Sequence, residues 1–470
     1  MENATFINEK KIFGFIESAR LADEARISEI LQKALELKGL ETDEAAALLT
    51  IEDDATLEKL FAAASKIKDE IYGNRLVLFA PLYISNYCAN NCLYCGFRAD
   101  NRDIVRNTLT LDEIRDETLA ILEQGHKRVL MLMGESHAKC SFDYFLEAID
   151  AVYSVKDSKG SSIRRINVEI APLTNEEFEK IAQVKIGTYT VFQETYHLET
   201  YKKMHPRGIK SDYEWRLYSM DRALKHGLHD VGIGALFGLF DYRFDTLALI
   251  EHAKYLDSTY GVGPHTISIP RIKPASHAPA SLEIPHAVSD RDFKKLIAVL
   301  RLSVPYTGMI LSTRESAALR TELFDMGISQ ISAGSRTSPG GYKQALNESP
   351  AEEVDASQFS LNDARTSGEI IRDVIKHGYV PSFCTGCYRL GRVGEDFMDL
   401  AKPGLIKLNC LPNALTTLKE YLVDYADGET KELGEELIER ELGEIPSDAR
   451  RKKTVEFLAK IEGGERDLYF

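Results

Sequence analysis

Apolar residues recur every three or four positions toward the end of the first 74 residues. They form one stripe, made of Leu57, Leu60, Phe61, Ala64, Ile67 and Ile71. This spacing is typical of an amphipathic helix with one buried face. Gly73-Asn74 is a typical helix end. We therefore predict a helical N-terminal extension, residues 1–74, that packs on a larger core.

From residue 76 to about residue 340, short apolar runs alternate with amphipathic segments. The runs predict eight strands, at residues 76–84, 128–134, 166–172, 188–194, 229–236, 265–271, 306–313 and 329–334. Helical patterns fill most gaps, as at residues 111–124, 212–225 and 290–302. Such alternation predicts parallel strands, and about 250 residues is the usual size of a closed (βα)8 barrel. An open doubly wound sheet is the alternative, although no Gly-x-Gly-x-x-Gly turn follows the first strand.

The alternation stops beyond residue 340. Residues 347–362 are a polar connection, and helical patterns return at residues 361–376 and 415–425. The C-terminal residues are dense in Glu, Lys and Arg and predict surface helices. We expect an α/β protein with a barrel at residues 75–340 and a mostly helical C-terminal domain at residues 341–470.

Composition and charge narrow the classes of protein. At 470 residues the chain can bury a large core, and 44% hydrophobic with 28% charged residues is ordinary for a globular protein. The formal net charge of −15 disfavours a nucleic-acid partner, which needs a basic face. No apolar run is long enough for a bilayer, and the N-terminus lacks the pattern of a signal peptide. The sequence therefore predicts a cytoplasmic protein without a membrane partner.

Six of the seven cysteines fall into two triplets. The triplets are Cys88, Cys92 and Cys95, and Cys384, Cys387 and Cys410. This grouping fits metal ligation in a reducing compartment better than disulfide bonds. The remaining cysteine, Cys140, is expected to be a small buried hydrophobic residue.

The first triplet, Cys88-Ala-Asn-Asn-Cys92-Leu-Tyr-Cys95, directly follows the first predicted strand. Three thiolates on one loop are typical ligands of an iron–sulfur cluster. Because a cubane has four irons, one iron keeps an open position that can chelate the amino and carboxylate groups of S-adenosylmethionine (SAM). Structural zinc is the alternative, but it needs four ligands, usually in pairs, and this spacing is different.

The spacing of these cysteines resembles the motif of the radical SAM superfamily. The resemblance implies a [4Fe-4S] cluster that cleaves bound SAM to a 5′-deoxyadenosyl radical. It also implies SAM contacts by five residues: Tyr94, Gly134, Glu135, Glu194 and Arg216. For Arg216 the alternative is an exposed position on the predicted helix at residues 212–225.

Polar residues follow several of the predicted strands, where a barrel places its active site. Ser312 and Arg314, after the seventh strand, suit the carboxylate of an amino-acid substrate, since an Arg fork binds both oxygens. Arg271 and Arg336 are further candidates. Enclosure in a barrel would orient the substrate hydrogen toward the radical.

The second triplet again supplies three thiolates, from Cys384-x-x-Cys387 and from Cys410. A closed structural zinc or iron–sulfur site would favour four ligands. We therefore predict a second cluster with an open iron. Zinc completed by a distant His or Asp is the alternative.

Together the two triplets resemble those of the HydG family, tyrosine lyases of [FeFe]-hydrogenase maturation. Three internal stretches add to the likeness: Phe192-Gln-Glu-Thr-Tyr-His197, Val231-Gly-Ile-Gly-Ala-Leu236 and Ser268-Ile-Pro-Arg271. These stretches are also similar to the 2-iminoacetate synthase (ThiH) family of thiamin synthesis, which lacks the second cluster. The chain is therefore expected to be a radical SAM enzyme rather than a non-catalytic iron–sulfur scaffold or carrier.

The resemblance implies the reaction and the partners. The radical abstracts hydrogen from the amino group of L-tyrosine, and Cα–Cβ cleavage yields p-cresol and dehydroglycine. Dehydroglycine becomes CO and cyanide at the second cluster, which carries an additional iron. The implied partners are an electron donor, hydrogenase maturation proteins and free cysteine.

His265 opens the sixth predicted strand, at the end opposite the first cysteine triplet. Imidazole is a suitable ligand of non-haem iron. The resemblance implies that His265 binds the additional iron, while a capping or core histidine is the alternative. The C-terminal domain would then seal this end, with the barrel interior as a conduit between the clusters.

Overall fold

A computed structural model describes residues 5–346 and 356–470, so part of the predicted polar connection and the N-terminal residues weighed for a signal peptide lie outside it. Four helices precede the first strand: α1 (Glu9–Ala19), α2 (Glu24–Ala34), α3 (Thr42–Leu49) and α4 (Asp54–Tyr72). The predicted apolar stripe lies on α4, where Leu57, Leu60 and Ile67 are buried. The predicted helical extension is confirmed. It consists of four helices, and the predicted apolar stripe belongs to the last of them.

Eight parallel strands form a closed barrel, in the order of the sequence. They are β1 (Arg75–Ser85), β2 (Arg128–Met133), β3 (Arg165–Glu169), β4 (Tyr189–Glu194), β5 (Val231–Ala235), β6 (Thr266–Ser268), β7 (Gly308–Leu311) and β8 (Gln330–Ser332). Strand β1 pairs with both β2 and β8, which closes the sheet. The (βα)8 barrel is confirmed, and the open sheet is excluded.

Helices connect the strands around the barrel. They are α5 (Leu111–Glu123), α6 (Phe142–Ser154), α7 (Asn175–Ile181), α8 (Leu198–Met204), α9 (Tyr213–Leu217), α10 (Ser219–Lys225), α11 (Tyr242–Tyr260), α12 (Pro279–Leu282), α13 (Asp290–Ser303), α14 (Ala317–Asp325) and α15 (Gly341–Leu346). The prediction of a single helix at residues 212–225 is wrong, because the helix is interrupted between α9 and α10. At the break, the Arg222 side chain donates to the carbonyl of Trp215, at 2.6 Å.

The C-terminal part is mostly helical, as predicted, but also contains a ninth strand. Its elements are α16 (Ser367–Lys376), β9 (Val380–Ser382), α17 (Gly386–Arg389), α18 (Gly394–Ala401), α19 (Lys407–Asp424), α20 (Gly428–Gly443) and α21 (Asp448–Glu462). Strand β9 runs parallel to the first residues of β1 and ends the sheet order. An edge position tolerates Pro381, which cannot donate to the ladder.

Two predicted C-terminal helices have different bounds. Residues 361–366 are not helical, because the N–H groups of Asn362 and Asp363 donate to the carbonyl of Thr313, each at 3.1 Å, and Thr366 caps α16. Helix α19 begins eight residues earlier than the predicted segment at 415–425, at Lys407, and contains Pro412. Cys410 therefore lies on a helix rather than in a loop.

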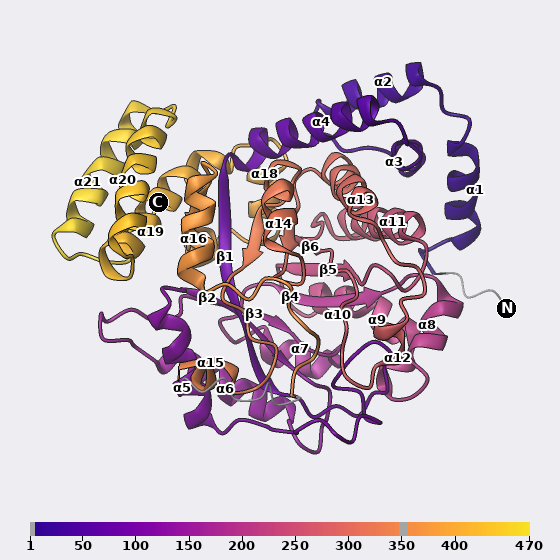
Figure 1. Ribbon diagram of the computed structural model, residues 1–470, viewed down its shortest axis with the longest axis horizontal. Coiled ribbons are helices and arrows are strands. Elements are labelled where there is room, and N and C mark those ends of the chain that lie inside the picture. Colours follow the sequence, from indigo (N-terminus) through magenta and orange to yellow (C-terminus); the bar gives the residue numbers. More distant parts are fainter. Residues whose placement is uncertain (1–4, 347–355) are drawn as a thin grey trace.

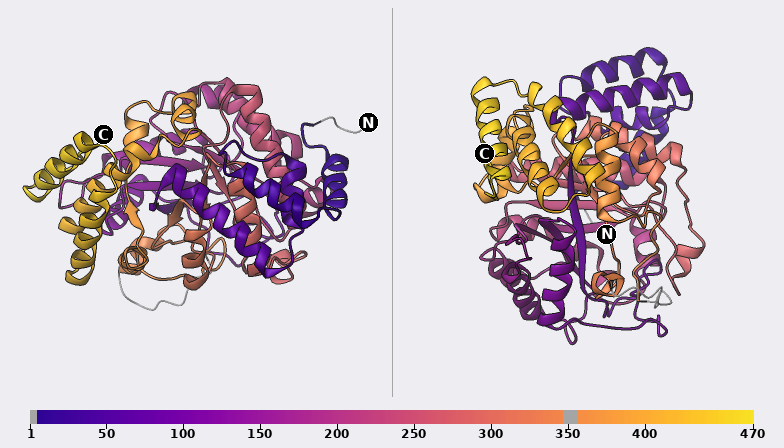
Figure 2. Two further views of the ribbon diagram at one scale, coloured as in Figure 1. Left: turned by 90° about the horizontal axis from the view of Figure 1, so that it is seen from above. Right: turned by 60° about the vertical axis from the view of Figure 1, so that its left-hand side comes forward.

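The N-terminal and C-terminal helices gather at the end of the barrel where β1 begins, and the loops that follow the strands form the other end (Figure 1). A second view shows the same separation (Figure 2). One connected hydrophobic core runs through the N-terminal helices, the barrel and the C-terminal helices. Within the described residues, no helix has the length and apolar character needed to cross a membrane.

Candidate active site

The first cysteine triplet lies on the loop after β1, where neighbouring loops hold its backbone. The N–H of Ala89 donates to the carbonyl of Glu135 at 2.7 Å, and the N–H of Leu93 to that of Met204 at 3.0 Å. Burial raises the pKa of Cys92 to about 12 and that of Cys95 to about 11. Because thiolates are disfavoured in this environment, they need a bound cation, and metal ligation deprotonates a thiol outright.

The loop and the ends of the neighbouring strands enclose a cavity of about 950 Å³. Among its lining residues are the three cysteines and all five predicted SAM contacts, Tyr94, Gly134, Glu135, Glu194 and Arg216. A Cβ on Gly134 would collide with the carbonyl of Tyr87, so only glycine permits this approach of the cysteine loop. Cys140 is buried beside it and its Sγ donates to the Gly134 carbonyl at 3.2 Å.

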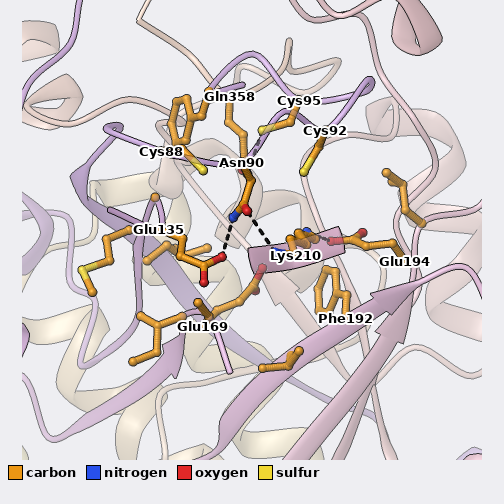
Figure 3. Close-up of a pocket in the computed structure, with 18 of the residues that line it drawn as sticks. Cys88, Asn90, Cys92, Cys95, Glu135, Glu169, Phe192, Glu194, Lys210 and Gln358 are labelled. Atoms are coloured by element: carbon orange, nitrogen blue, oxygen red, sulfur yellow. Dashed lines mark hydrogen bonds and ion pairs between the residues drawn. The ribbon is translucent and has the colours of Figure 1, made fainter. Parts of the chain in front are cut away.

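A polar network lines the side of the cavity that faces the cysteines (Figure 3). Asn90 donates to Glu135, and its side-chain oxygen accepts from the N–H of Lys210 at 2.9 Å. Lys210 Nζ donates to Glu194 at 2.6 Å. The sequence analysis did not predict Asn90 or Lys210 as site residues. Only Asn90 could have been found from the sequence, because it lies inside the cysteine motif.

Glu194 and Arg216 continue this network, since Glu194 also lies 3.7 Å from the Arg216 guanidinium. The Nε of Arg216 donates to the carbonyl of Phe192 at 2.6 Å, and Arg216 is buried, so the exposed alternative is wrong. Burial alone would raise the pKa of Glu194, but the nearby Lys210 and Arg216 charges lower it overall. Glu194 also has a φ of 72°, a strained conformation of the kind found at functional sites.

A second cavity, of about 610 Å³, continues from the first toward β7 and β8. Ser312 and Arg314 line it, together with Ser335 and Thr337. The Arg314 guanidinium stacks 3.3 Å from the ring centroid of Phe359. The two predicted substrate contacts are therefore brought to one cavity, which adjoins the cavity of the cysteine loop.

Arg271 and Arg336 do not line either cavity. Pro270 interrupts the strand ladder, so β6 ends at Ser268 and the predicted strand end at Arg271 is wrong. Arg271 instead pairs with Glu315 and, at 2.8 Å, with Asp290, beside a separate surface cavity. The sequence-based substrate role of Arg271 stays a prediction, and its pairing does not favour it.

The second cysteine triplet lies at the opposite end of the barrel. Cys384 follows β9, Cys387 lies on α17 and Cys410 lies on α19. All three line a cavity of about 580 Å³ that also contains His265. The fold thus brings together four predicted ligands from positions up to 145 residues apart (410 − 265).

Positive side chains surround this triplet, which sequence reasoning missed. Arg75, Arg128 and Arg165, at the first positions of their strands, line the cavity. Burial, and then the neighbouring Arg165 charge, lower the pKa of Arg128 to about 9. Burial raises the pKa of Cys387 to about 12.

The donor set of each triplet fits an iron–sulfur cluster. Two buried polar atoms at the second triplet, Arg75 Nε and Arg128 Nε, have no hydrogen-bond partner among the described residues, whereas His265 Nδ1 lies 3.5 Å from a carboxylate oxygen of Asp230. Unpartnered buried polar groups are rare and indicate a missing ligand. No group of three His, Cys, Asp or Glu in the described part of the chain is arranged to hold a metal ion directly. A four-iron cluster is wider than one ion and suits thiols that lie farther apart.

Comparison with known proteins defines the class. The model of the "Radical SAM superfamily" matches residues 82–252, and that of the "Biotin and Thiamin Synthesis associated domain" matches residues 268–380. Together with the barrel and its three-cysteine loop, these matches mark the chain as a radical SAM enzyme. The class implies a [4Fe-4S] cluster and SAM as cofactors.

Relatives narrow the class further. The 2-iminoacetate synthase of Escherichia coli (strain K12) is 32% identical over 380 residues, which cover 81% of this chain and 96% of that protein. A crystal structure of HydG, a maturase of the [FeFe]-hydrogenase, is 50% identical, covers 99% of this chain and 100% of that chain, and has a TM-score of 0.95. HydG from Carboxydothermus hydrogenoformans is 40% identical, with coverages of 96% and 97% and a TM-score of 0.82. The chain belongs to the HydG family of the radical SAM superfamily, as its cysteine triplets and internal stretches predicted.

Proposed function

We propose that the protein cleaves L-tyrosine to p-cresol and dehydroglycine, and then forms CO and cyanide at an auxiliary iron–sulfur cluster for [FeFe]-hydrogenase assembly. The observation that carries this proposal is the cavity of the second cysteine triplet, at the far end of the barrel, which is lined by Cys384, Cys387, Cys410 and His265. It favours the HydG reaction over that of a 2-iminoacetate synthase, because the 2-iminoacetate synthase family lacks a second cluster. Coverage agrees, because the HydG structures span nearly the whole chain and the synthase spans 81%.

At the first site, Cys88, Cys92 and Cys95 would hold a [4Fe-4S] cluster, which supplies the electron that cleaves SAM to the 5′-deoxyadenosyl radical. Glu135 and Glu194 supply carboxylates for the amino and hydroxyl groups of SAM. Arg314 offers an unpaired fork to the tyrosine carboxylate, with Ser312 lining the same cavity. The barrel wall keeps bulk water from the radical.

At the second site, Cys384, Cys387 and Cys410 would hold a cluster and His265 an additional iron, which together supply the centre where CO and cyanide form. Arg75, Arg128 and Arg165 offset the negative charge of the thiolates and attract anionic fragments into the cavity. An electron donor, free cysteine and hydrogenase maturation proteins are the proposed partners.

The test is anaerobic incubation of the reconstituted protein with tyrosine, SAM and reductant, alongside the Cys387→Ala variant. We expect p-cresol, CO and cyanide from the natural sequence. The variant should keep p-cresol, lose CO, and contain less iron and sulfide, with one cluster signal missing from its EPR spectrum.

Two other outcomes identify the alternatives. If the natural sequence forms p-cresol without CO or cyanide, the protein is a 2-iminoacetate synthase. If reduction with SAM yields no 5′-deoxyadenosine, it is a scaffold or carrier, and the proposed reaction is wrong.

A further inference from the structure

The side chain of Glu169 lies where the two cavities of the active site meet. Glu169 is the last residue of β3 and pairs in register with Leu132 of β2 and Thr190 of β4. It lines both the cavity of the cysteine loop and the cavity of Ser312. Figure 3 shows its carboxylate pointing into the cavity below the cysteine loop. No role for this carboxylate follows from the sequence motifs.

Within the described part of the chain, the Glu169 carboxylate has neither a hydrogen-bond nor an ion-pair partner. This contrasts with Glu135 and Glu194, which are both engaged by neighbouring side chains. A carboxylate without a partner in an enclosed cavity is costly, and a ligand with a cationic or donor group would relieve that cost.

Arg314 lines the same two cavities as Glu169. Within the described residues its guanidinium has neither a hydrogen-bond nor an ion-pair partner, and it stacks on the ring of Phe359. The charges of Glu169 and Arg314 are close enough to influence each other. A free carboxylate and a free guanidinium across one cavity match the ammonium and carboxylate of a zwitterionic α-amino acid.

We propose that Glu169 and Arg314 together bind the zwitterionic head of the amino-acid substrate, and that Glu169 removes a proton from its ammonium group. The proposal rests on the tyrosine lyase activity proposed above. The proton moves from nitrogen to a Glu169 oxygen, so an ammonium and a carboxylate become a neutral amine and a carboxylic acid. The acid returns the proton to water when the products leave.

The step has a chemical reason. Hydrogen-atom abstraction from a neutral amine leaves a neutral radical, whereas abstraction from an ammonium would concentrate a positive charge on an electron-deficient nitrogen. The amine must therefore be free of its extra proton before the radical reacts. A base at the junction of the cofactor and substrate cavities is placed for this task, because the amino group must face both the base and the radical.

Electrostatics support the assignment. Burial, and then the neighbouring Glu194 charge, raise the pKa of Glu169 to about 7 against the opposing charges of Arg314, Lys210 and Arg216. A base is most effective when its pKa lies near the working pH. The other titratable groups that line the cofactor cavity are Tyr83, Cys88, Cys92, Tyr94, Cys95 and Glu135. Below about pH 7, Glu169 is protonated and can no longer accept the proton, so activity should fall as pH decreases.

The test compares Glu169→Gln, Glu169→Asp and the matched control Glu176→Gln, an exposed residue in the first turn of α7. Tyrosine-dependent formation of 5′-deoxyadenosine and p-cresol is measured from pH 6 to pH 9.5 in reconstituted protein. For the natural sequence we expect kcat/KM to rise with pH to a plateau, with an apparent pKa near 7. Glu169→Gln should lower the rate about 100-fold at neutral pH, the usual scale of general base catalysis.

The shape of the pH profile separates a base from a structural residue. In Glu169→Gln the rate should keep rising at alkaline pH, because tyrosine then loses its proton in solution. Glu169→Asp should restore the plateau in part, and Glu176→Gln should match the natural sequence. Glu169→Gln should also weaken tyrosine binding about tenfold relative to 3-(4-hydroxyphenyl)propanoate, a competitive inhibitor without an amino group, since a hydrogen bond to a charged group is lost. The comparison is between the KM for tyrosine and the Ki of the inhibitor.

Three results would overturn the assignment. They are a Glu169→Gln profile that matches the natural one, a uniform loss without alkaline recovery, or loss of the SAM-induced change in the EPR spectrum of the reduced cluster. The last result would assign Glu169 to cofactor binding. If the natural sequence itself gives no tyrosine-dependent 5′-deoxyadenosine, the proposed function fails instead, and this outcome is visible before any variant is compared.

Discussion

The arginine side chains of this protein differ chiefly in whether they already form an ion pair with a carboxylate of the same chain. Arg271 and Arg320 are engaged by Glu315 and Asp363, so their guanidinium groups are committed to the protein. Arg314 is half-buried at the junction of two cavities, where its guanidinium stacks on an aromatic ring and has no carboxylate partner among the described residues. Because an Arg fork in an enclosed site favours a carboxylate, Arg314 is the group best placed to select an amino acid.

We therefore predict that Arg314→Met raises the KM for tyrosine about 10- to 100-fold, since a hydrogen bond to a charged group contributes about 1.5–3 kcal/mol. Steady-state p-cresol formation over a range of tyrosine concentrations checks this, with cluster content and SAM binding measured in parallel. Arg336→Gln is the comparison, because Arg336 lines neither cavity and contacts the Ser335 carbonyl, at 3.3 Å. An equal effect of both substitutions would argue against a specific role of Arg314.

At the scale of elements, the turn between α5 and β2 decides how α19 docks on the barrel. Gly125 ends α5 with a φ of 87° and packs directly against the ring of Tyr421 on α19. A Cβ at this position would lie 2.5 Å from that ring. The glycine is thus needed both for its backbone conformation and for the close approach of the helix that carries Cys410.

Gly125→Ala should therefore loosen α19, whereas Gly160→Ala should not. Gly160 has a similar φ of 77° but no atom within 4 Å of its would-be Cβ, so it isolates the backbone cost of about 1–2 kcal/mol. Hydrogen exchange of the α19 amides provides the measurement. Faster exchange in both variants alike would mean that the contact with Tyr421 is unimportant.

For the whole molecule, the proposed formation of CO and cyanide requires the C-terminal helices to stay docked on the barrel end. A buried ion pair joins them, between Arg164 beside β3 and Glu420 on α19. Glu420 also accepts from the N–H of Asp467, at 3.0 Å. The Arg128 side chain adds a hydrogen bond, at 2.9 Å, to the carbonyl of Cys384. Polar contacts across this junction therefore hold the second cysteine triplet against His265.

Glu420→Ala should weaken this docking by about 1.5–3 kcal/mol, because it removes one of the two carboxylates that pair with Arg164 and leaves only Asp467, at 3.0 Å. We expect CO formation to fall more than p-cresol formation, and the C-terminal helices to become sensitive to limited proteolysis. Glu436→Ala, on the exposed side of α20, serves as the control. A parallel loss of CO and p-cresol would show that the two ends of the barrel are not independent.

Much of the architecture follows from the sequence, because strands, helices and turns depend on residues close together in the chain. The alternation of apolar runs predicted the eight strands, and the grouping of the cysteines predicted that each triplet gathers at one site. Errors concentrated at short elements, such as β9 and the break between α9 and α10, where contacts with distant segments decide the conformation.

Only the tertiary structure decided whether each charged side chain is buried, paired with an opposite charge or facing a cavity. Local patterns do not distinguish Arg314, which faces a cavity, from Arg271, which is paired with Glu315. Nor do they reveal Glu169 and Lys210 in the cofactor cavity, or the arginines around the second triplet. The physical reason is that burial and charge pairing depend on residues brought together from separate strands, and neither is encoded in the local periodicity of the chain.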